Sequence, residues 1–111
     1  MVINFLTNLV GDVYKILPMK EEEIKGAKNH LPEYVKRTII NMKGSLMTYS
    51  ELKIYKEYLY IINSLEYLLS EEAGLDEYRQ TILNATHVIS KLRTIFKKKA
   101  EHEQKDGVWY L

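Results

Sequence analysis

The sequence contains no cysteine, and only two prolines and five glycines among its 111 residues. Without cysteine the chain can form no disulfide, no zinc–thiolate site and no thiol nucleophile. The scarcity of proline and glycine leaves long stretches without the residues that interrupt helices. A hydrophobic core alone is therefore expected to stabilise the protein, and a chain of about a hundred residues is long enough to form one.

Neither sign of charge dominates, since 16 lysines and arginines stand against 15 aspartates and glutamates, a formal net charge of +1. A general polyanion binder carries a large positive excess, so the balance argues against nucleic acid as a partner. No apolar stretch approaches the roughly 18 residues of a membrane span. The segment Met1–Leu6 lacks the basic region and the cleavage site of a signal peptide. We expect a cytoplasmic protein.

Apolar residues recur at helical spacing along most of the chain, and nothing alternates with the period of two that marks a strand. The pattern predicts an all-α protein, a compact bundle of four main helices with one short extra helical segment near residues 19–30. We expect one domain over residues 1–107 and an apolar tail over residues 108–111.

The first helix is predicted to run from Val2 to Leu17, because apolar residues fill one half of a helical wheel and polar residues the other half. Pro18 is expected to end it, since the residue before a proline is pushed out of the α region. The next main helix is predicted to begin at Pro32 and to end near Gly44–Met47. Its buried stripe is formed by Val35, Ile39, Met42 and Leu46.

Two long helices are predicted in the second half of the chain. Thr48 and Glu51 have the spacing of a capping box, so the third main helix should begin there and run to Ala73, with Gly74 as a left-handed cap. The fourth should begin at Asp76. Its apolar residues step by threes and fours along one seam, formed by Leu75, Tyr78, Ile82, Ala85, Ile89, Leu92 and Phe96. A short connection makes the two helices an antiparallel hairpin, of about 25 residues per arm.

The sequence contains no pattern typical of a catalytic or metal site. His87 falls on the polar side of its helix with no metal ligand one turn away, while His30 and His102 lie in a break and near a helix end. No glutamate has a histidine three residues later, as inward-facing bundle metal sites require. Single glycines form no phosphate loop. We therefore expect neither enzymatic activity nor a cofactor.

Two tyrosines interrupt the polar face of the third predicted helix. Tyr60 and Tyr67 lie seven residues apart beside Lys56 and Asn63, and Tyr49 is expected on the same side. We call Lys56, Tyr60, Asn63 and Tyr67 the tyrosine stripe. Tyrosine is enriched at interfaces because it combines a large rigid contact with a polar tip. Either the first or second helix covers this side, or the stripe contacts a protein partner.

The C-terminus is a second anomaly, because termini are usually polar. Gly107 is expected to break the last helix, and four apolar residues follow it, namely Val108, Trp109, Tyr110 and Leu111. They either fold back into a groove of the bundle or form a short motif that inserts into a partner, with Trp109 and Tyr110 as its contact residues.

A basic cluster near the end of the last helix suggests an alternative function as a DNA- or RNA-associated accessory protein. Its residues are Lys91, Arg93, Lys97, Lys98 and Lys99. The same cations suit a helix C-terminus, however, and Glu101 and Glu103 interrupt the run.

In architecture alone, a helical bundle of this length with a distinctive C-terminal tail resembles bacteriocin immunity proteins, and small phage regulators and inhibitors are similar. The likeness rests on fold and size and transfers no residues. Frequent Ile, Lys, Tyr, Asn and Glu suggest a low-GC bacterium or its phage. Our hypothesis is a non-enzymatic protein that regulates or inhibits a protein partner by direct contact, through the tyrosine stripe, the tail or both. A homo-oligomer is a further hypothesis, because two hairpins could pair their apolar faces.

Overall fold

The computed structural model describes residues 1–70 and 73–109, with side chains described through His102. Over these residues the chain is helical and contains no strand, which confirms the predicted all-α class. The elements are α1 (Val2–Tyr14), α2 (Ile16–Ile24), α3 (Leu31–Thr48), the 3-10 helix η1 (Ser50–Ile54), α4 (Lys56–Ser70) and α5 (Leu75–Trp109).

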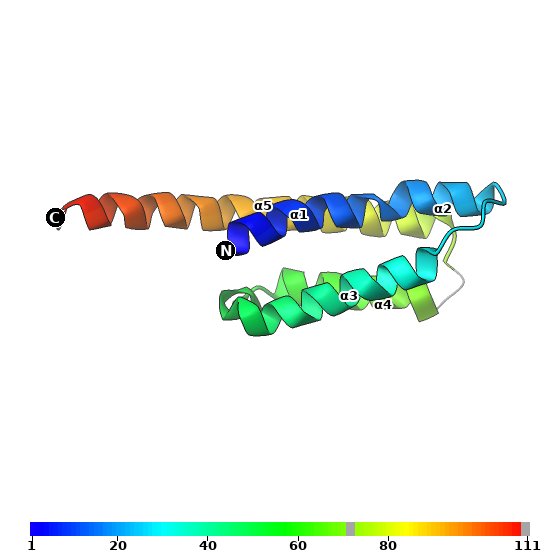
Figure 1. Cartoon of the computed structure of the whole chain (residues 1–111), viewed down its shortest axis with the longest axis horizontal. Coiled ribbons are helices and arrows are strands. Elements are labelled where there is room, and N and C mark those ends of the chain that lie inside the picture. Colours follow the sequence, from blue (N-terminus) through cyan, green and yellow to red (C-terminus); the bar gives the residue numbers. More distant parts are fainter. Residues whose placement is uncertain (71–72, 110–111) are drawn as a thin grey trace.

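The helices form a bundle whose rods run alternately in opposite directions (Figure 1). α1 and α2 lie end to end as one rod, which packs antiparallel on α5, while α3 and α4 form the other layer. α2 also contacts α3, and α4 contacts α5, so the rods enclose one core. The molecule measures 61 × 21 × 19 Å. Its long dimension comes from α5, which extends beyond the other helices.

The predicted seam of the last helix faces this core. Leu75 is half-buried, and the residues that follow it along the seam are at most 7% exposed, namely Tyr78, Ile82, Ala85, Ile89, Leu92 and Phe96. α1 supplies buried residues at matching intervals, namely Val2, Leu6, Leu9 and Val13. A repeat near 3.5 residues keeps one stripe facing a neighbouring helix over many turns, so the spacing alone located the centre of the core.

The first rod is interrupted at Lys15, so the predicted end of the first helix at Pro18 is wrong. Pro18 has no N–H and cannot donate to the carbonyl of Tyr14. On either side the ladder is intact, because Lys15 donates to Gly11 at 3.2 Å and Met19 donates to Lys15 at 3.3 Å. Proline tolerates the first turn of a helix, where its fixed φ is already suitable, and Pro18 therefore lies inside α2.

Gly26 ends α2 earlier than the extra segment predicted near residues 19–30. Its φ of 94° lies in the left-handed region. The N–H groups of Gly26 and Ala27 donate to the carbonyls of Glu23 and Glu22, both at 3.0 Å. These two bonds make a Schellman motif, which satisfies the last carbonyls of the helix and turns the chain toward α3.

Replacing Gly26 by alanine is expected to lower the free energy of unfolding by about 1 kcal/mol, because a Cβ is disfavoured in the left-handed region. Urea unfolding followed by circular dichroism measures the change. Gly11→Ala is the matched control, since Gly11 lies inside α1 and, apart from its chain neighbours and the backbone of the helix itself, no atom lies within 4 Å of the position that a Cβ would take there. It should stabilise the protein by up to about 1 kcal/mol. Equal signs for the two substitutions would contradict this account.

The connection between α3 and α4 differs from the predicted capping box. Thr48 is the last residue of α3, and its hydroxyl donates to the carbonyl of Gly44 at 3.4 Å. η1 and the extended residue Tyr55 follow, so the third main helix begins at Lys56 rather than at Thr48. Leu52 of η1 is fully buried. Burial of this side chain favours the tight turn over the continuous helix that the local cap signal predicts.

The hairpin formed by α4 and α5 has arms of 15 and 35 residues, so the predicted equal arms are wrong. Gly74 is not a left-handed cap, because among the described glycines only Gly26 has a positive φ. The N–H of Gly74 donates to Oε2 of Glu77 at 2.5 Å, and the carbonyl of Gly74 accepts from the N–H of Tyr78 at 3.1 Å. Gly74 thus caps the start of α5.

α5 continues through Gly107 to Trp109, and the predicted helix break at Gly107 is wrong. A single glycine inside a helix costs only about 1 kcal/mol relative to alanine. Tyr110 and Leu111 lie outside the described residues, so the tail over residues 108–111 remains a prediction.

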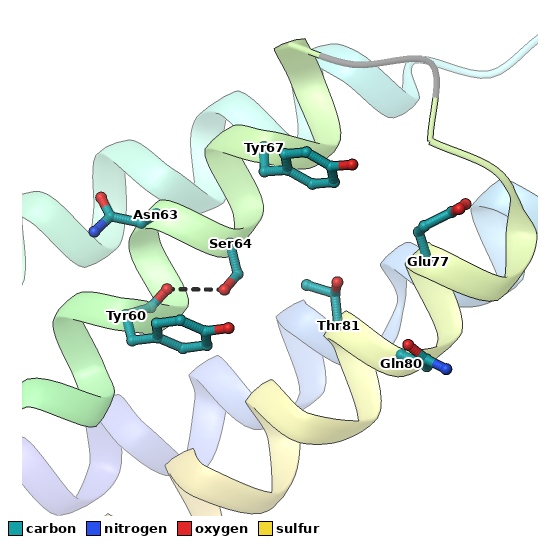
Figure 2. A pocket seen from close by; sticks show the side chains of 7 residues that line it. All are labelled: Tyr60, Asn63, Ser64, Tyr67, Glu77, Gln80 and Thr81. Carbon is teal, nitrogen blue, oxygen red and sulfur yellow. Dashed lines mark hydrogen bonds between the residues drawn. The ribbon is translucent and has the colours of Figure 1, made fainter.

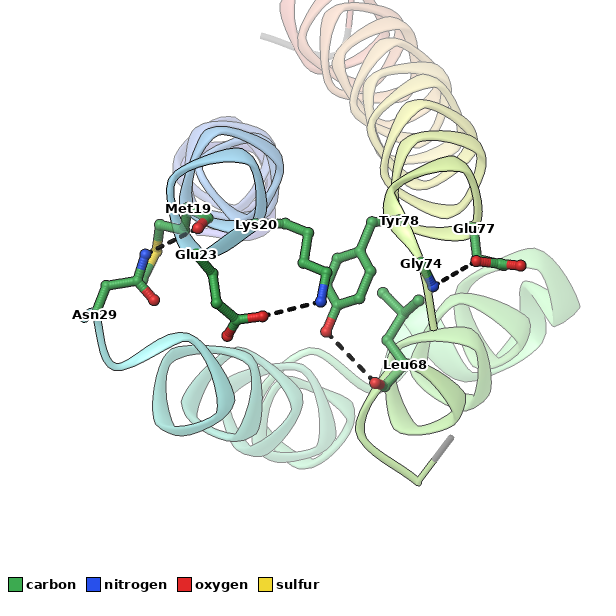
Figure 3. A network of polar contacts seen from close by, with 8 residues as sticks. All are labelled: Met19, Lys20, Glu23, Asn29, Leu68, Gly74, Glu77 and Tyr78. Atoms are coloured by element: carbon green, nitrogen blue, oxygen red, sulfur yellow. Dashed lines mark hydrogen bonds and ion pairs between the residues drawn. The ribbon is translucent and has the colours of Figure 1, made fainter. Parts of the chain in front are cut away.

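Polar contacts tie together the end of the bundle where α2, α4 and α5 meet (Figure 3). Nζ of Lys20 lies 2.9 Å from Oε1 of Glu23 and 4.7 Å from the ring centroid of Tyr78. The hydroxyl of Tyr78 donates to the carbonyl of Leu68 at 3.4 Å. One ring thereby contacts both neighbouring helices and fixes the start of α5.

Candidate functional site

Tyr60 and Tyr67 project from α4 toward α5, and both rings remain accessible to solvent (Figure 2). Tyr60 is 63% exposed and Tyr67 is 51% exposed. α1 packs on α5, and α3, the second main helix, packs on α4. Because both rings are still more than half exposed, the interpretation that the first or second main helix covers the two tyrosines is wrong, and the rings form part of the accessible surface.

An open groove follows the line between α4 and α5. The part nearer the α4–α5 connection has a volume of about 390 Å³ and is lined by Tyr60, Asn63, Ser64, Tyr67, Glu77, Gln80 and Thr81. The adjoining part has a volume of about 400 Å³ and is lined by Lys56, Glu57, Tyr60, Asn84 and Val88. Tyr60 belongs to both parts. The structure thus places all four residues of the tyrosine stripe along one groove, which we call the α4/α5 groove.

Helix geometry explains why the stripe stays together. Its residues are spaced by four, three and four, which keeps them on one side of α4. The opposite side of α4 is buried and includes Tyr58, Ile61, Leu65 and Leu68. Within the groove the hydroxyl of Ser64 donates to the carbonyl of Tyr60 at 2.9 Å. Asn63 points away from α5 and lies at the outer rim (Figure 2).

Polar groups surround the two rings of the groove. Thr81 points toward the rings from α5 (Figure 2), Gln80 also lines the groove, and Glu77 already accepts the N–H of Gly74. Burial raises the pKa of Tyr34, Tyr58 and Tyr78, three tyrosines that lie outside the α4/α5 groove. The groove therefore offers aromatic contact area and hydrogen-bonding groups, which suit recognition of a surface.

Tyr49 does not belong to the stripe, and its predicted direction is wrong. Its ring lies 5.5 Å from the ring of Phe5, measured between centroids. Its hydroxyl accepts a hydrogen bond from the N-terminal amine of Met1 at 3.3 Å. Tyr49 follows α3 and precedes η1, so it does not share the helical geometry of α4.

The basic cluster is distributed around α5. Successive residues of a helix are about 100° apart, so Lys97, Lys98 and Lys99 point in three directions. Nζ of Lys99 donates to the hydroxyl of Tyr55 at 3.0 Å and lies 5.6 Å from the ring centroid of Phe96. Lys91, Lys97 and Lys98 are exposed. The structure therefore does not gather these lysines into one basic face.

α5, whose last residue is Trp109, extends beyond the other helices (Figure 1). Ala100 still lines a groove together with Met1 and Phe96. Nine residues farther along, Trp109 lies about 14 Å beyond that level, at the rise of an α-helix. This course differs from a tail that folds back into the bundle, and the other predicted tail residue, Tyr110, lies outside the described part of the chain.

Within the described ranges, no group of three or more histidine, aspartate or glutamate side chains could hold a metal ion. His30 and His87 are exposed. No helix of the described chain is long and apolar enough to cross a membrane.

No protein-family model, curated protein or solved structure matches this chain. The site is therefore interpreted from its geometry. Sequence reasoning found the α4 side of the groove through its two unexpected tyrosines but missed the α5 side. Four residues of α5 that line the groove have the same spacing of four, three and four and lie next to the buried seam, namely Glu77, Thr81, Asn84 and Val88. This spacing was the signal for the α5 side.

Proposed function

We propose that the protein binds a partner protein through the α4/α5 groove and regulates or inhibits that partner by contact, without catalysis. The exposure of Tyr60 and Tyr67 on the wall of this groove is the observation that supports the proposal. Aromatic rings that remain this exposed are typical of interfaces. Burying one such side chain contributes on the order of 2 kcal/mol.

The surroundings of the rings support a protein partner. Asn63, Gln80 and Asn84 supply amide donors and acceptors, while Lys56 and Glu57 place charges of both signs at one end. An aromatic centre with a polar and charged rim is the usual composition of a protein–protein interface. Mixed charge at the rim favours a partner surface of mixed charge over a polyanion.

The double substitution Tyr60→Ala/Tyr67→Ala is expected to abolish partner binding and to change the free energy of unfolding by less than about 0.5 kcal/mol, because both side chains are on the surface. The measurement is a tagged pull-down from the native host, combined with thermal unfolding by circular dichroism. Tyr14→Ala is the matched control, since Tyr14 is 54% exposed on α1, outside the groove. This control should retain the partner. A chain truncated after Gly107 tests the contribution of Trp109 and Tyr110 separately.

Three outcomes would contradict the proposal. A large loss of stability in the double variant, with every association intact, would assign the tyrosines to the packing of the bundle. Recovery of only the wild-type chain itself would favour a homo-oligomer, whereas salt-sensitive recovery of nucleic acid would direct attention to Lys91, Lys97 and Lys98.

A further inference from the structure

α3 carries a second exposed stripe, on a helix that does not line the α4/α5 groove. Lys36, Ile40, Lys43 and Met47 are spaced by four, three and four, and we call them the basic–apolar stripe. Ile40 is 67% exposed, and Met47 is 85% exposed, the highest value among the large hydrophobic residues described. The side of α3 opposite the stripe is buried and includes Thr38, Met42 and Ser45. Ile40 and Met47 therefore do not belong to the hydrophobic core.

The stripe carries positive charge. Lys36 and Lys43 are both exposed, and they alternate with the apolar side chains. Nζ of Lys43 lies 3.2 Å from Oε1 of Glu66 on α4, and the two side chains are 55% and 45% exposed. Ion pairs this exposed contribute little to stability, so Lys43 can exchange Glu66 for another carboxylate at small cost.

We propose that the basic–apolar stripe binds an acidic amphipathic α-helix of a partner protein. Ile40 and Met47 are seven residues apart, so they lie on one side of α3 and can contact the apolar side of a second helix, while the lysines that alternate with them select a helix of opposite charge. From Lys36 to Met47 the stripe is about 17 Å long at the rise of an α-helix, or three turns of the bound helix.

The width and composition of the stripe favour this occupant over other anionic surfaces. Insertion into a membrane interface needs a broad apolar face, whereas the stripe is one residue wide and has lysines between its apolar residues. Phosphate contacts of nucleic acid would use Lys36 and Lys43 but not Ile40 or Met47. Only a helix with both leucine-like and carboxylate side chains uses all four residues.

The experiment uses two synthetic stapled helices of about 16 residues, a length at which an unstapled helix would be marginal. Both carry leucine at steps of four, three and four; one has flanking glutamates and its twin has lysines. Methyl NMR on the full chain follows Ile40 and Met47, and fluorescence anisotropy gives the affinities. The glutamate helix should shift both methyl signals and bind about tenfold more tightly than its twin. Added salt should reduce that difference.

Variants locate the contacts. Lys36→Glu/Lys43→Glu should reverse the preference between the two helices, and Ile40→Ser/Met47→Ser should remove binding of both. Glu66→Gln should strengthen binding of the glutamate helix, because Lys43 then has no competing carboxylate. Unchanged circular dichroism spectra and melting temperatures confirm that each variant is folded. Tyr60→Ala/Tyr67→Ala should bind the glutamate helix normally, which separates this proposal from that for the α4/α5 groove.

Equal affinity for the two helices, shifts confined to methyl groups outside α3, or no binding of the glutamate helix would overturn the proposal. So would Ile40- and Met47-dependent binding to phosphatidylserine vesicles, or Lys36- and Lys43-dependent binding to duplex DNA, in the absence of any preference for the glutamate helix.

Discussion

Replacing Tyr58 by alanine is expected to lower the free energy of unfolding by about 4 kcal/mol, a large part of the stability of a small domain. Tyr58 is completely buried, and it is the largest of the fully buried side chains in the described part of the chain. Its hydroxyl lies 2.6 Å from Oγ of Ser45, which in turn donates to the carbonyl of Met42 at 2.5 Å. The substitution therefore leaves a cavity between α3 and α4 and removes a buried hydrogen bond.

Two matched variants isolate these contributions. Tyr58→Phe keeps the ring and loses only the hydroxyl, so the expected loss is about 1 kcal/mol. Tyr60→Ala removes the same type of ring two residues along the helix, where 63% of the side chain is exposed. Its expected effect is within about 0.5 kcal/mol. Urea unfolding followed by circular dichroism gives all three values. Similar losses for Tyr58→Ala and Tyr60→Ala would contradict the assignment of one tyrosine to the core and the other to the surface.

The core could be predicted where one periodic pattern continues over many turns. The seam from Leu75 to Phe96 continues over six steps of three or four residues without a proline or glycine, so an error at either end does not change which side is buried. α1 was predictable for the same reason. Amphipathic spacing reports which side of a helix meets the core, and it does so independently of the helix ends.

The connections could not be predicted, because local signals there compete with tertiary packing. Thr48 and Glu51 have the spacing of a capping box, yet burial of Leu52 holds the chain in η1 instead. Pro18 has no N–H to donate to the carbonyl of Tyr14, one turn earlier. The helix is therefore interrupted at Lys15 and not at Pro18 itself. In both places the sequence identifies a break but misplaces a helix boundary, the end of α1 by three residues and the start of α4 by eight.

The candidate site was half predictable for a related reason. Tyr60 and Tyr67 contrast with their polar neighbours, and that contrast was visible in the sequence. The residues that complete the groove, such as Gln80 and Thr81, are ordinary surface residues of α5. Helical spacing placed Ile39 in the buried stripe of α3, but it did not single out the neighbouring Ile40, which is exposed. Surfaces formed by two helices require knowledge of how the helices are placed.

The stability of the protein is expected to fall as the pH rises above about 10, the ordinary pKa of tyrosine. Burial raises the pKa of Tyr58 to about 12, and its hydrogen bond with Ser45 opposes part of that rise. The pKa values of Tyr34 and Tyr78 are also raised, in each case mainly by burial. A raised pKa in the folded state means that the unfolded state releases its proton first. The contribution of Tyr58 is therefore complete below about pH 10 and is lost progressively up to about pH 12.

Between those limits each pH unit lowers the free energy of unfolding by about 1.4 kcal/mol through Tyr58 alone. Urea unfolding at about pH 8 and about pH 11, on either side of the ordinary tyrosine pKa, measures the loss. Tyr58→Phe is the decisive comparison, because it cannot ionise at this position. The variant should be less stable than the wild type at the lower pH and should lose about 1.4 kcal/mol less between the two conditions. If both proteins lose the same amount, the buried pair of Tyr58 and Ser45 does not control the alkaline transition, and the lysines or the other tyrosines must do so.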